Sequence, residues 1–289
     1  MTNIRCVWKA GALLGEGPIW DEEEEAAYWV DIKAPAVHRY TPASGLTATW
    51  AMPEPIGCIA RRSGGGFVAG FKSGFAFLDL ASGHIEKIGD PEPEQPNNRL
   101  NDGKCDLKGR FWVGTMDDEE SRPTGWLYRL DPDRTWHHMD GSYVVTNGPA
   151  FSPDGRTIYH TDSFRRIIYA FDLAPDGTLA NKRVFVRLPD ADGYPDGMTT
   201  DSQGFLWVAH WGGWRVTRFT PKGSVDRIIE LPVSQVTSCV FGGRDLDVLY
   251  ITSAWIGLDK KAHLEQPLAG GLFEVSAGVR GLPTPRFAG

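Results

Sequence analysis

The 289-residue sequence lacks several features that mark common classes of protein. Its four cysteines contain no Cys-x-x-Cys pair, which argues against a zinc ribbon or a redox motif, and we expect all four to be buried free thiols. No apolar run of about 18 residues is present, and the first residues contain no apolar segment typical of a secretory signal. We therefore expect a soluble, cytoplasmic protein with no membrane partner.

A basic surplus is also missing. The formal charge is −7 and the pI is near 5.5, whereas proteins that bind nucleic acid normally concentrate Lys and Arg on one face. The acidic run Glu22 to Glu25 lies between two strand-like segments, so we interpret it as a solvated turn. We expect a small-molecule ligand, no nucleic acid, and a monomer or a weak oligomer.

Familiar catalytic motifs are absent as well. The seven histidines include no His-x-x-x-His pair, and there is no Gly-x-Ser-x-Gly sequence for a serine nucleophile. Phosphate-binding loops and dinucleotide fingerprints are missing too. His160 and His210 lie in strand-like segments and are predicted to be packed strand residues.

What the chain does contain is a weak internal repeat. Short strand-like segments led by an aromatic residue recur at intervals of 38, 45, 47, 48 and 43 residues, with the anchors Trp29, Phe67, Trp112, Tyr159, Trp207 and Tyr250. This period fits one four-stranded propeller blade, and 11 Trp, 14 Phe and 34 Gly suit short aromatic strands joined by tight turns. We predict an all-β fold, a six-bladed β-propeller forming a single domain over residues 1–289, in which the segment beginning at Ile4 closes the ring.

Four polar residues recur at nearly the same phase of this repeat. They precede their anchors by 13, 11, 12 and 11 positions and are Glu16, Asn101, Asn147 and Asp196. A ring of blades would bring them together at one end of the central channel. Three of them are followed by Gly, which alternatively indicates a hairpin turn, but the shared phase favours a common site. Their hard oxygen donors suit Ca²⁺, Mg²⁺ or Mn²⁺, with Zn²⁺ and Fe²⁺ as further options.

The residues resemble a known family, the gluconolactonase, senescence-marker-protein and regucalcin-like group of six-bladed propellers. The resemblance extends over essentially the whole chain, through Leu14-Gly-Glu-Gly-Pro, Asn98-Arg-Leu-Asn-Asp-Gly-Lys, Val113-Gly-Thr-Met, Thr146-Asn-Gly-Pro-Ala-Phe-Ser-Pro-Asp-Gly and Tyr194-Pro-Asp-Gly-Met. It is strongest toward bacterial sugar lactonases such as xylonolactonase.

The resemblance implies a site as well as an activity. Glu16, Asn147 and Asp196 would bind one divalent metal ion, while Arg99 and Asn101 would contact a sugar lactone. The resemblance also implies a substrate-facing acid at Glu119, within the loop Asp117-Asp-Glu-Glu, which offers several candidates. The implied activity is that of a hydrolase of carboxylic ester bonds, which converts an aldono-lactone to its aldonic acid.

Three points stay open at the level of sequence. Asp196 either acts as the general base or only positions the attacking water, because a metal-bound carboxylate has a low pKa. The activity itself has rivals, namely a non-enzymatic calcium-binding or scaffold propeller and an arylesterase-type hydrolase. Trp211, Trp214 and Trp255 either pack in the blades or form an apolar wall for the sugar.

Overall fold

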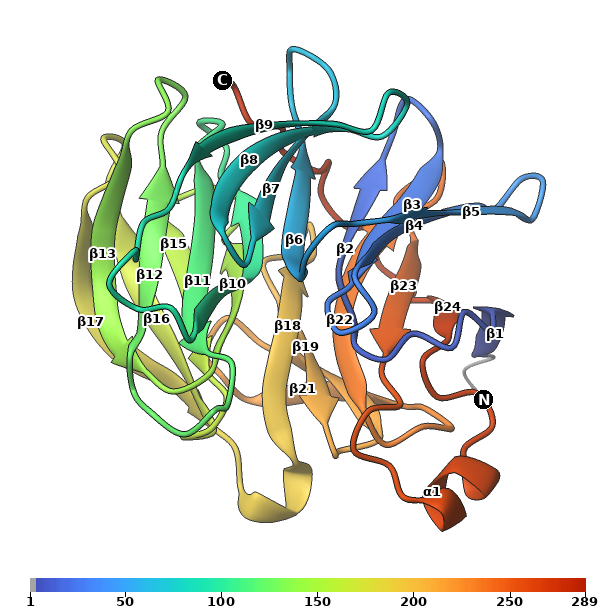
Figure 1. Cartoon of the computed structure of the whole chain (residues 1–289). Coiled ribbons are helices and arrows are strands. Elements are labelled where there is room, and N and C mark those ends of the chain that lie inside the picture. Colours follow the sequence, from blue (N-terminus) through green and yellow to red (C-terminus); the bar gives the residue numbers. More distant parts are fainter. Residues whose placement is uncertain (1–3) are drawn as a thin grey trace.

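The computed structural model describes residues 4–289 and confirms the predicted propeller (Figure 1). Six four-stranded antiparallel sheets surround a central channel. Blade 1 contains β2 (Gly15–Asp21), β3 (Ala26–Asp31), β4 (Ala36–Thr41) and β5 (Leu46–Ala51). Blade 2 contains β6 (Ile56–Arg61), β7 (Phe67–Phe71), β8 (Gly74–Asp79) and β9 (His84–Gly89). Blade 3 contains β10 (Asn98–Cys105), β11 (Phe111–Asp117), β12 (Gly125–Leu130) and β13 (Trp136–Tyr143).

The second half of the chain continues the same pattern. Blade 4 contains β14 (Thr146–Phe151), β15 (Thr157–Asp162), β16 (Ile167–Leu173) and β17 (Leu179–Arg187). Blade 5 contains β18 (Tyr194–Thr200), β19 (Leu206–Trp211), β20 (Arg215–Phe219) and β21 (Val225–Glu230). Blade 6 contains β22 (Val236–Gly242), β23 (Val248–Ser253), β24 (Leu272–Ser276) and the N-terminal strand β1 (Arg5–Trp8), which pairs with β24. The predicted closure of the ring by the N-terminal segment is therefore confirmed.

The aromatic anchors all lie on the second strand of a blade and are buried. Trp29, Trp112 and Trp207 are at most 2% exposed, and the core lies between neighbouring blades, where their rings pack. Two of these tryptophans are fixed by a carboxylate on the preceding turn. Asp106 accepts from Trp112 Nε1 and Asp201 accepts from Trp207 Nε1, each at 2.9 Å. The same aspartates accept backbone N–H groups of their turns, so each one joins a turn to the core.

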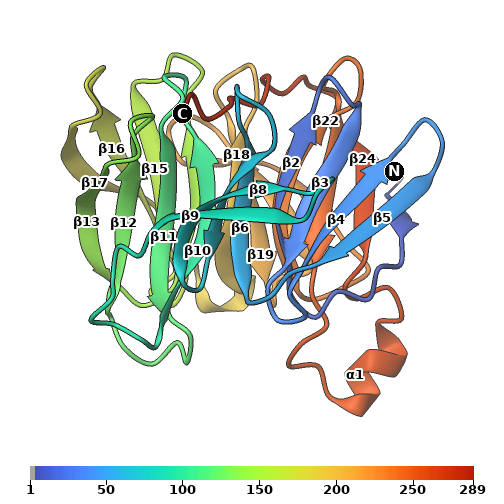
Figure 2. The same cartoon turned by 45° about the horizontal axis from the view of Figure 1, so that its top comes forward.

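The two ends of the propeller differ. A helix, α1 (Lys260–Glu265), and a short 3₁₀ helix, η1 (Asp190–Asp192), lie at the end where the inner strands begin, and the C-terminus lies at the opposite end (Figures 1 and 2). The repeat did not predict α1, since the helix is only six residues long; the side chain of Asp259 caps it by accepting from Ala262 N at 2.8 Å. No helix between residues 4 and 289 is long and apolar enough to cross a membrane.

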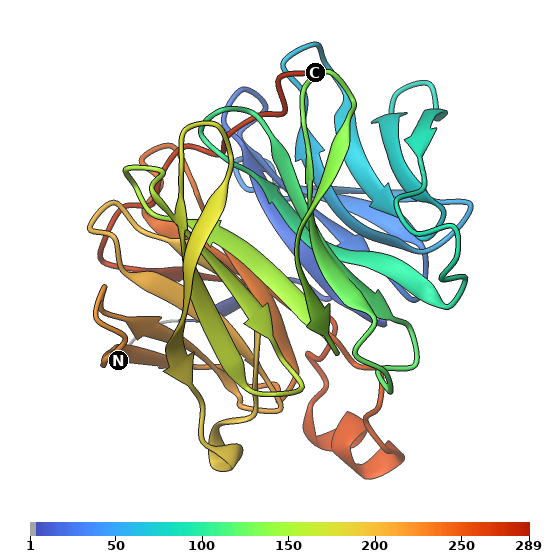
Figure 3. The same ribbon diagram turned by 90° about the vertical axis from the view of Figure 1, so that its left-hand side faces the viewer.

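The segment after β24 crosses the end of the channel opposite α1 (Figure 3). Its backbone bonds successively to blades 5 and 6 near Arg280, to blade 2 through Phe287, and to blade 3 through Ala288. Phe287 is completely buried and packs in the core between blades 2 and 3. The tail therefore covers the far end of the channel and leaves the α1 end as the open one.

The cysteines agree with the prediction in part. All four are free, and Cys58, Cys105 and Cys239 are buried. The prediction of a buried thiol is wrong for Cys6, which is half-buried because it lies on the short outer strand β1 at the rim of blade 6.

Candidate active site

Each inner strand is interrupted by one extra residue at the same level of the channel. In blade 1 the interruption lies between Glu16 and Ile19, and in blade 4 it lies between Asn147 and Ala150. The inner strands of the other four blades shift register at the equivalent point. A bulge bends its strand and redirects a side chain. The glycines after the predicted ligands therefore belong to bulges within strands, and the alternative of hairpin turns is wrong.

The bulges place the predicted residues around a cavity of about 400 Å³ at the α1 end of the channel. Its wall contains Glu16, Arg99, Asn101, Asn147 and Asp196, which come from four blades. These five side chains are at most 5% exposed. Residues spread over some 180 positions of sequence thus meet around one cavity.

Glu16 and Asp196 form the acidic centre of the site. Their carboxyl groups share a hydrogen bond, and Glu16 also accepts from Gly17 N at 2.9 Å. Burial raises the pKa of both groups above the ordinary carboxyl range, and the charge of Glu16 raises the pKa of Asp196 further. A cation placed between them would relieve both effects, because it would stabilise the charged form of each carboxylate.

Asn147 is held by hydrogen bonds on both sides of its amide. Its Nδ2 donates to Ser163 Oγ at 2.8 Å, and its Oδ1 accepts from Asn101 Nδ2 at 3.2 Å. Asn101 Oδ1 in turn accepts from the guanidinium of Arg99. The amide oxygen of Asn147 is therefore oriented, and a chain of bonds joins it to Arg99.

Arg99 is buried at 3% exposure and is fixed by a carboxylate from the neighbouring loop. Its Nε donates to Asp118 Oδ1 at 2.6 Å, and Lys33 Nζ donates to the same oxygen at 2.7 Å. Because Lys33 follows β3 and Asp118 follows β11, the carboxylate bridges blades 1 and 3 across one side of the cavity mouth. The bridge holds the guanidinium in one orientation, as a fixed donor to a ligand's oxygens requires.

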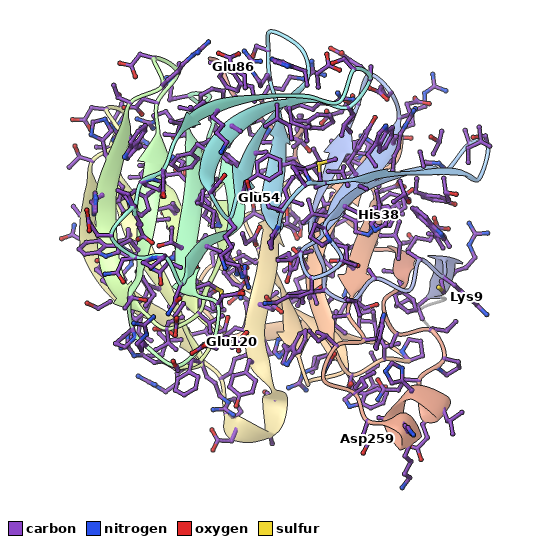
Figure 4. The ribbon with its side chains drawn as sticks, viewed as in Figure 1. Lys9, His38, Glu54, Glu86, Glu120 and Asp259 are labelled. Carbon is purple, nitrogen blue, oxygen red and sulfur yellow. The ribbon has the colours of Figure 1, made fainter. Side chains whose placement is uncertain are left out.

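In the loop between β11 and β12, the acid that lines the cavity is Glu120, one residue after the predicted Glu119. Both Glu119 and Glu120 are exposed, but Glu120 lines the cavity and its charge reaches Asp196, whereas Glu119 is not among the residues of the cavity wall. Glu120 has a positive φ of 56°, which turns the chain at this point. Figure 4 shows Glu120 at the same end of the molecule as Asp259, the capping residue of α1.

One of the three tryptophans considered for the apolar wall lies on it. Trp211, at the end of β19, lines the cavity together with Tyr194 and Phe164. Trp214 is 43% exposed and Trp255 donates to Gly11 O, and neither lines the cavity. The predicted packing of His160 and His210 is confirmed, since both rings are fully buried.

The sequence did not single out Asp102, the residue after Asn101. Its carboxylate is 2% exposed and accepts from Gly103 N and from Gly148 N. Burial raises its pKa to about 6. It occupies the repeat position at which Gly follows Glu16, Asn147 and Asp196, so the repeat phase gave no reason to select it.

The donor set fits a single hard divalent cation. Within the part of the chain that the structure describes, no three His, Cys, Asp or Glu side chains form a metal-binding cluster, which agrees with a set of two carboxylates and one amide. Two facing carboxyl groups with raised pKa values and an oriented amide oxygen are the groups that such an ion would engage. Three protein donors would leave coordination positions for water and a ligand.

Comparison with known proteins identifies the family of the chain. Residues 14–255 match the family described as the SMP-30/gluconolactonase/LRE-like region. The chain belongs to this family. Members of the SMP-30/gluconolactonase/LRE-like family that resemble it include sugar lactonases, so the resemblance drawn from the sequence motifs is confirmed.

Three proteins illustrate what the chain is similar to. A 6-deoxy-6-sulfogluconolactonase of Pseudomonas putida is 37% identical over 99% of both chains. An L-arabinolactonase of Azospirillum brasilense is 39% identical over 96% of this chain and 92% of its own. The solved structure of a calcium-binding regucalcin from Agrobacterium tumefaciens superposes with a TM-score of 0.95 at 29% identity, covering 99% of this chain and 97% of that one.

Proposed function

We propose that the protein is a metal-dependent sugar lactonase that hydrolyses a pentono- or hexono-lactone, such as xylonolactone, arabinolactone or gluconolactone, to the aldonic acid. The observation that carries this proposal is the set of Glu16, Asn147 and Asp196 in a cavity of about 400 Å³. A volume of this size suits a single sugar ring. The lactonase names of two relatives support the reaction class.

The substrate would contact two kinds of wall. Arg99 and Asn101 present donors for the lactone and hydroxyl oxygens, and Glu120 presents an acceptor for hydroxyl groups. The cavity wall also contains three aromatic residues, Trp211, Tyr194 and Phe164, which provide apolar surface for the C–H face of the ring. A substrate with many hydroxyl groups on a small ring matches this division.

Asp196 would move the proton in this reaction. A bound divalent ion would polarise the lactone carbonyl or lower the pKa of a bound water. The Asp196 carboxylate accepts a proton from water as the water oxygen bonds to the lactone carbon, and returns it to the ring oxygen as the carbon–oxygen bond breaks. This role requires a deprotonated Asp196. A bound cation would favour that form against the burial and the Glu16 charge that raise the pKa of Asp196.

The test measures acid release by the purified protein. D-xylono-, L-arabino- and D-glucono-lactones are compared with an aryl ester, first with the protein as purified, then after chelation, then with single divalent ions restored. We expect lactone hydrolysis that chelation removes and one ion restores, and a loss of at least about 10³-fold in kcat for Asp196→Asn in a folded protein. Normal turnover by Asp196→Asn would contradict the proposed role of Asp196. A preference for the aryl ester over the lactones would favour the arylesterase alternative.

A non-enzymatic calcium-binding protein is the second candidate, because the solved structure reported above is described as calcium-binding. Tight Ca²⁺ binding without hydrolysis of any lactone in the panel would support it. The cytoplasmic location and the monomeric or weakly oligomeric state stay predictions.

A further inference from the structure

Two consecutive residues of β10 contact the chain on both sides of Asn147. Asn101 Nδ2 donates to the carbonyl of Thr146 at 2.6 Å and to Asn147 Oδ1 at 3.2 Å. Asp102 Oδ2 accepts from Gly148 N at 3.0 Å. The backbone before Asn147 and the backbone after it are therefore both bound by one dipeptide from the neighbouring blade.

Both oxygens of Asp102 are occupied by backbone N–H groups. Oδ1 accepts from Gly103 N at 2.8 Å within β10, while Oδ2 reaches across to Gly148 N in β14. The side chain is buried and does not line the cavity. Its contacts are thus with the bulges that carry the site, and it has no direct contact with a ligand in the cavity.

The bulge at Gly148 needs this support. Gly148 has a φ of 78°, and the register of β14 is broken between Asn147 and Ala150, so the strand ladder leaves this N–H without a sheet partner. An unpaired buried N–H would cost about 1–3 kcal/mol. The carboxylate of Asp102 is the partner that replaces the missing strand contact.

β10 is itself fixed on the side facing blade 2. A Cβ on Gly57 would lie 2.3 Å from the carbonyl oxygen of Leu100 and 2.5 Å from that of Asn101. The backbone of β10 therefore packs directly on the backbone of β6 and has little room to move. A carboxylate on such a strand can hold the neighbouring bulge in one position.

We propose that Asp102 is a positioning residue for the metal site: its carboxylate fixes the bulge at Gly148 and so holds the amide oxygen of Asn147 toward the cation. The inference rests on the metal site of the proposed function. It assigns Asp102 no contact with the metal or the substrate. A partner that orients a ligand typically changes metal affinity about 10- to 100-fold when it is removed.

The rival explanation is that Asp102 only contributes to stability. Lys104, two residues along β10, donates to the carbonyl of Met198, and its charge lowers the pKa of Asp102, so the two could serve as a buried charge pair. A structural role would change the free energy of unfolding while leaving the affinity for the ion as it was. Metal affinity therefore separates the two explanations.

The test titrates the metal-free protein with Ca²⁺, Mn²⁺ and Zn²⁺ in a calorimeter, without substrate. Asp102→Asn keeps the shape of the side chain but replaces one acceptor oxygen by a donor, which faces an N–H. For the ion that the wild-type protein binds most tightly, we expect the dissociation constant to rise about 10- to 100-fold. We also expect kcat of the variant to recover when that ion is raised to saturation.

The control is Asp201→Asn, another buried carboxylate that accepts bonds from Trp207 and Arg218 but lies at the far end of blade 5. We expect it to lower the melting temperature and to keep the wild-type affinity. Unchanged affinity in Asp102→Asn, an equal loss in Asp201→Asn, or no ion binding by the wild type would each overturn the inference. If Asp102→Asn does not fold, the smaller Asp102→Ser gives the same comparison.

The readout also separates this inference from the proposed activity. Weakened metal binding by Asp102→Asn in a protein that hydrolyses no lactone supports the inference and removes the lactonase proposal. Wild-type metal affinity in the variant, together with lactone hydrolysis by the native protein, overturns the inference and supports the lactonase proposal.

Discussion

At the scale of single residues, four adjacent acids at the end of β11 and in the loop after it make different contacts. Asp117 is buried and binds Arg122, and Asp118 orients Arg99. Glu119 and Glu120 are both exposed, and of the two Glu120 lines the cavity. The pattern of the sequence could place an acidic loop beside the site but could not choose among its members, because the choice depends on the backbone turn at Glu120.

Substitution of the last two acids tests this division. We expect Glu120→Gln to raise KM for the lactone about tenfold, the equivalent of one hydrogen bond to a charged group, with a smaller effect on kcat. Glu119→Gln is the matched change one residue earlier, and steady-state kinetics of the pair on one lactone is the measurement. A larger effect at Glu119 would support the role that the family resemblance implied for it.

The sequence could predict that four residues are neighbours in space, namely Glu16, Asn101, Asn147 and Asp196. They occupy nearly the same position of their repeats, and a ring of blades brings such positions together around its axis. Asp102 could not be predicted as a neighbour, since adjacent Asn and Asp in a strand normally point to opposite faces. The bulge after Leu100 removes that alternation, and it leaves no strong mark in the sequence.

At the scale of elements, the C-terminal tail stabilises the closed ring without being part of a blade. It has no strand of the repeat, yet its backbone bonds to four blades, and Phe287 inserts between blades 2 and 3, with its ring centroid 6.0 Å from that of Phe77. The repeat pattern predicted the strands because aromatic anchors mark them. It gave no account of the tail, because the tail's partners are backbone groups of residues far away in the sequence.

Removal of the Phe287 side chain measures this contribution. We expect Phe287→Ala to lower the free energy of unfolding by about 3–5 kcal/mol, because a fully buried aromatic ring is lost from the core. Urea unfolding followed by tryptophan fluorescence is the measurement. Leu264→Ala on α1, at an 83% exposed position, serves as control and should change stability by less than about 0.5 kcal/mol. Equal effects of the two changes would show that the tail does not brace the ring.

At the scale of the whole molecule, two buried histidines make the fold sensitive to acid. Burial lowers the pKa of His160 to about 3 and that of His210 to about 4. In the unfolded chain both would have a pKa of about 6.5. The unfolded state therefore binds more protons below that pH, and the stability due to the neutral rings is lost as the pH falls.

His160 allows this effect to be isolated. Between pH 7.5 and pH 5, protonation of this residue in the unfolded chain should cost the fold about 2 kcal/mol. His160→Phe keeps a ring beside Tyr143 but has no group to protonate at this position. We expect its free energy of unfolding to fall by about 2 kcal/mol less than that of the wild type between pH 7.5 and pH 5. Unfolding free energies at several pH values provide the comparison, with the exposed His84→Gln as control. Parallel curves for wild type and His160→Phe would contradict the assignment.

Every inner strand carries a bulge at the level of the cavity. The backbone geometry of the site is therefore independent of which side chain each bulge presents. Six equivalent positions around the ring share one geometry, but the proposed metal donors occupy only three of them. At the corresponding positions of blades 2 and 6 stand Gly57 and Thr237, which supply no carboxylate. The number and charge of the donors can therefore change by substitution at a bulge, without any rearrangement of the blades, and the same ring can accommodate a different ion or none.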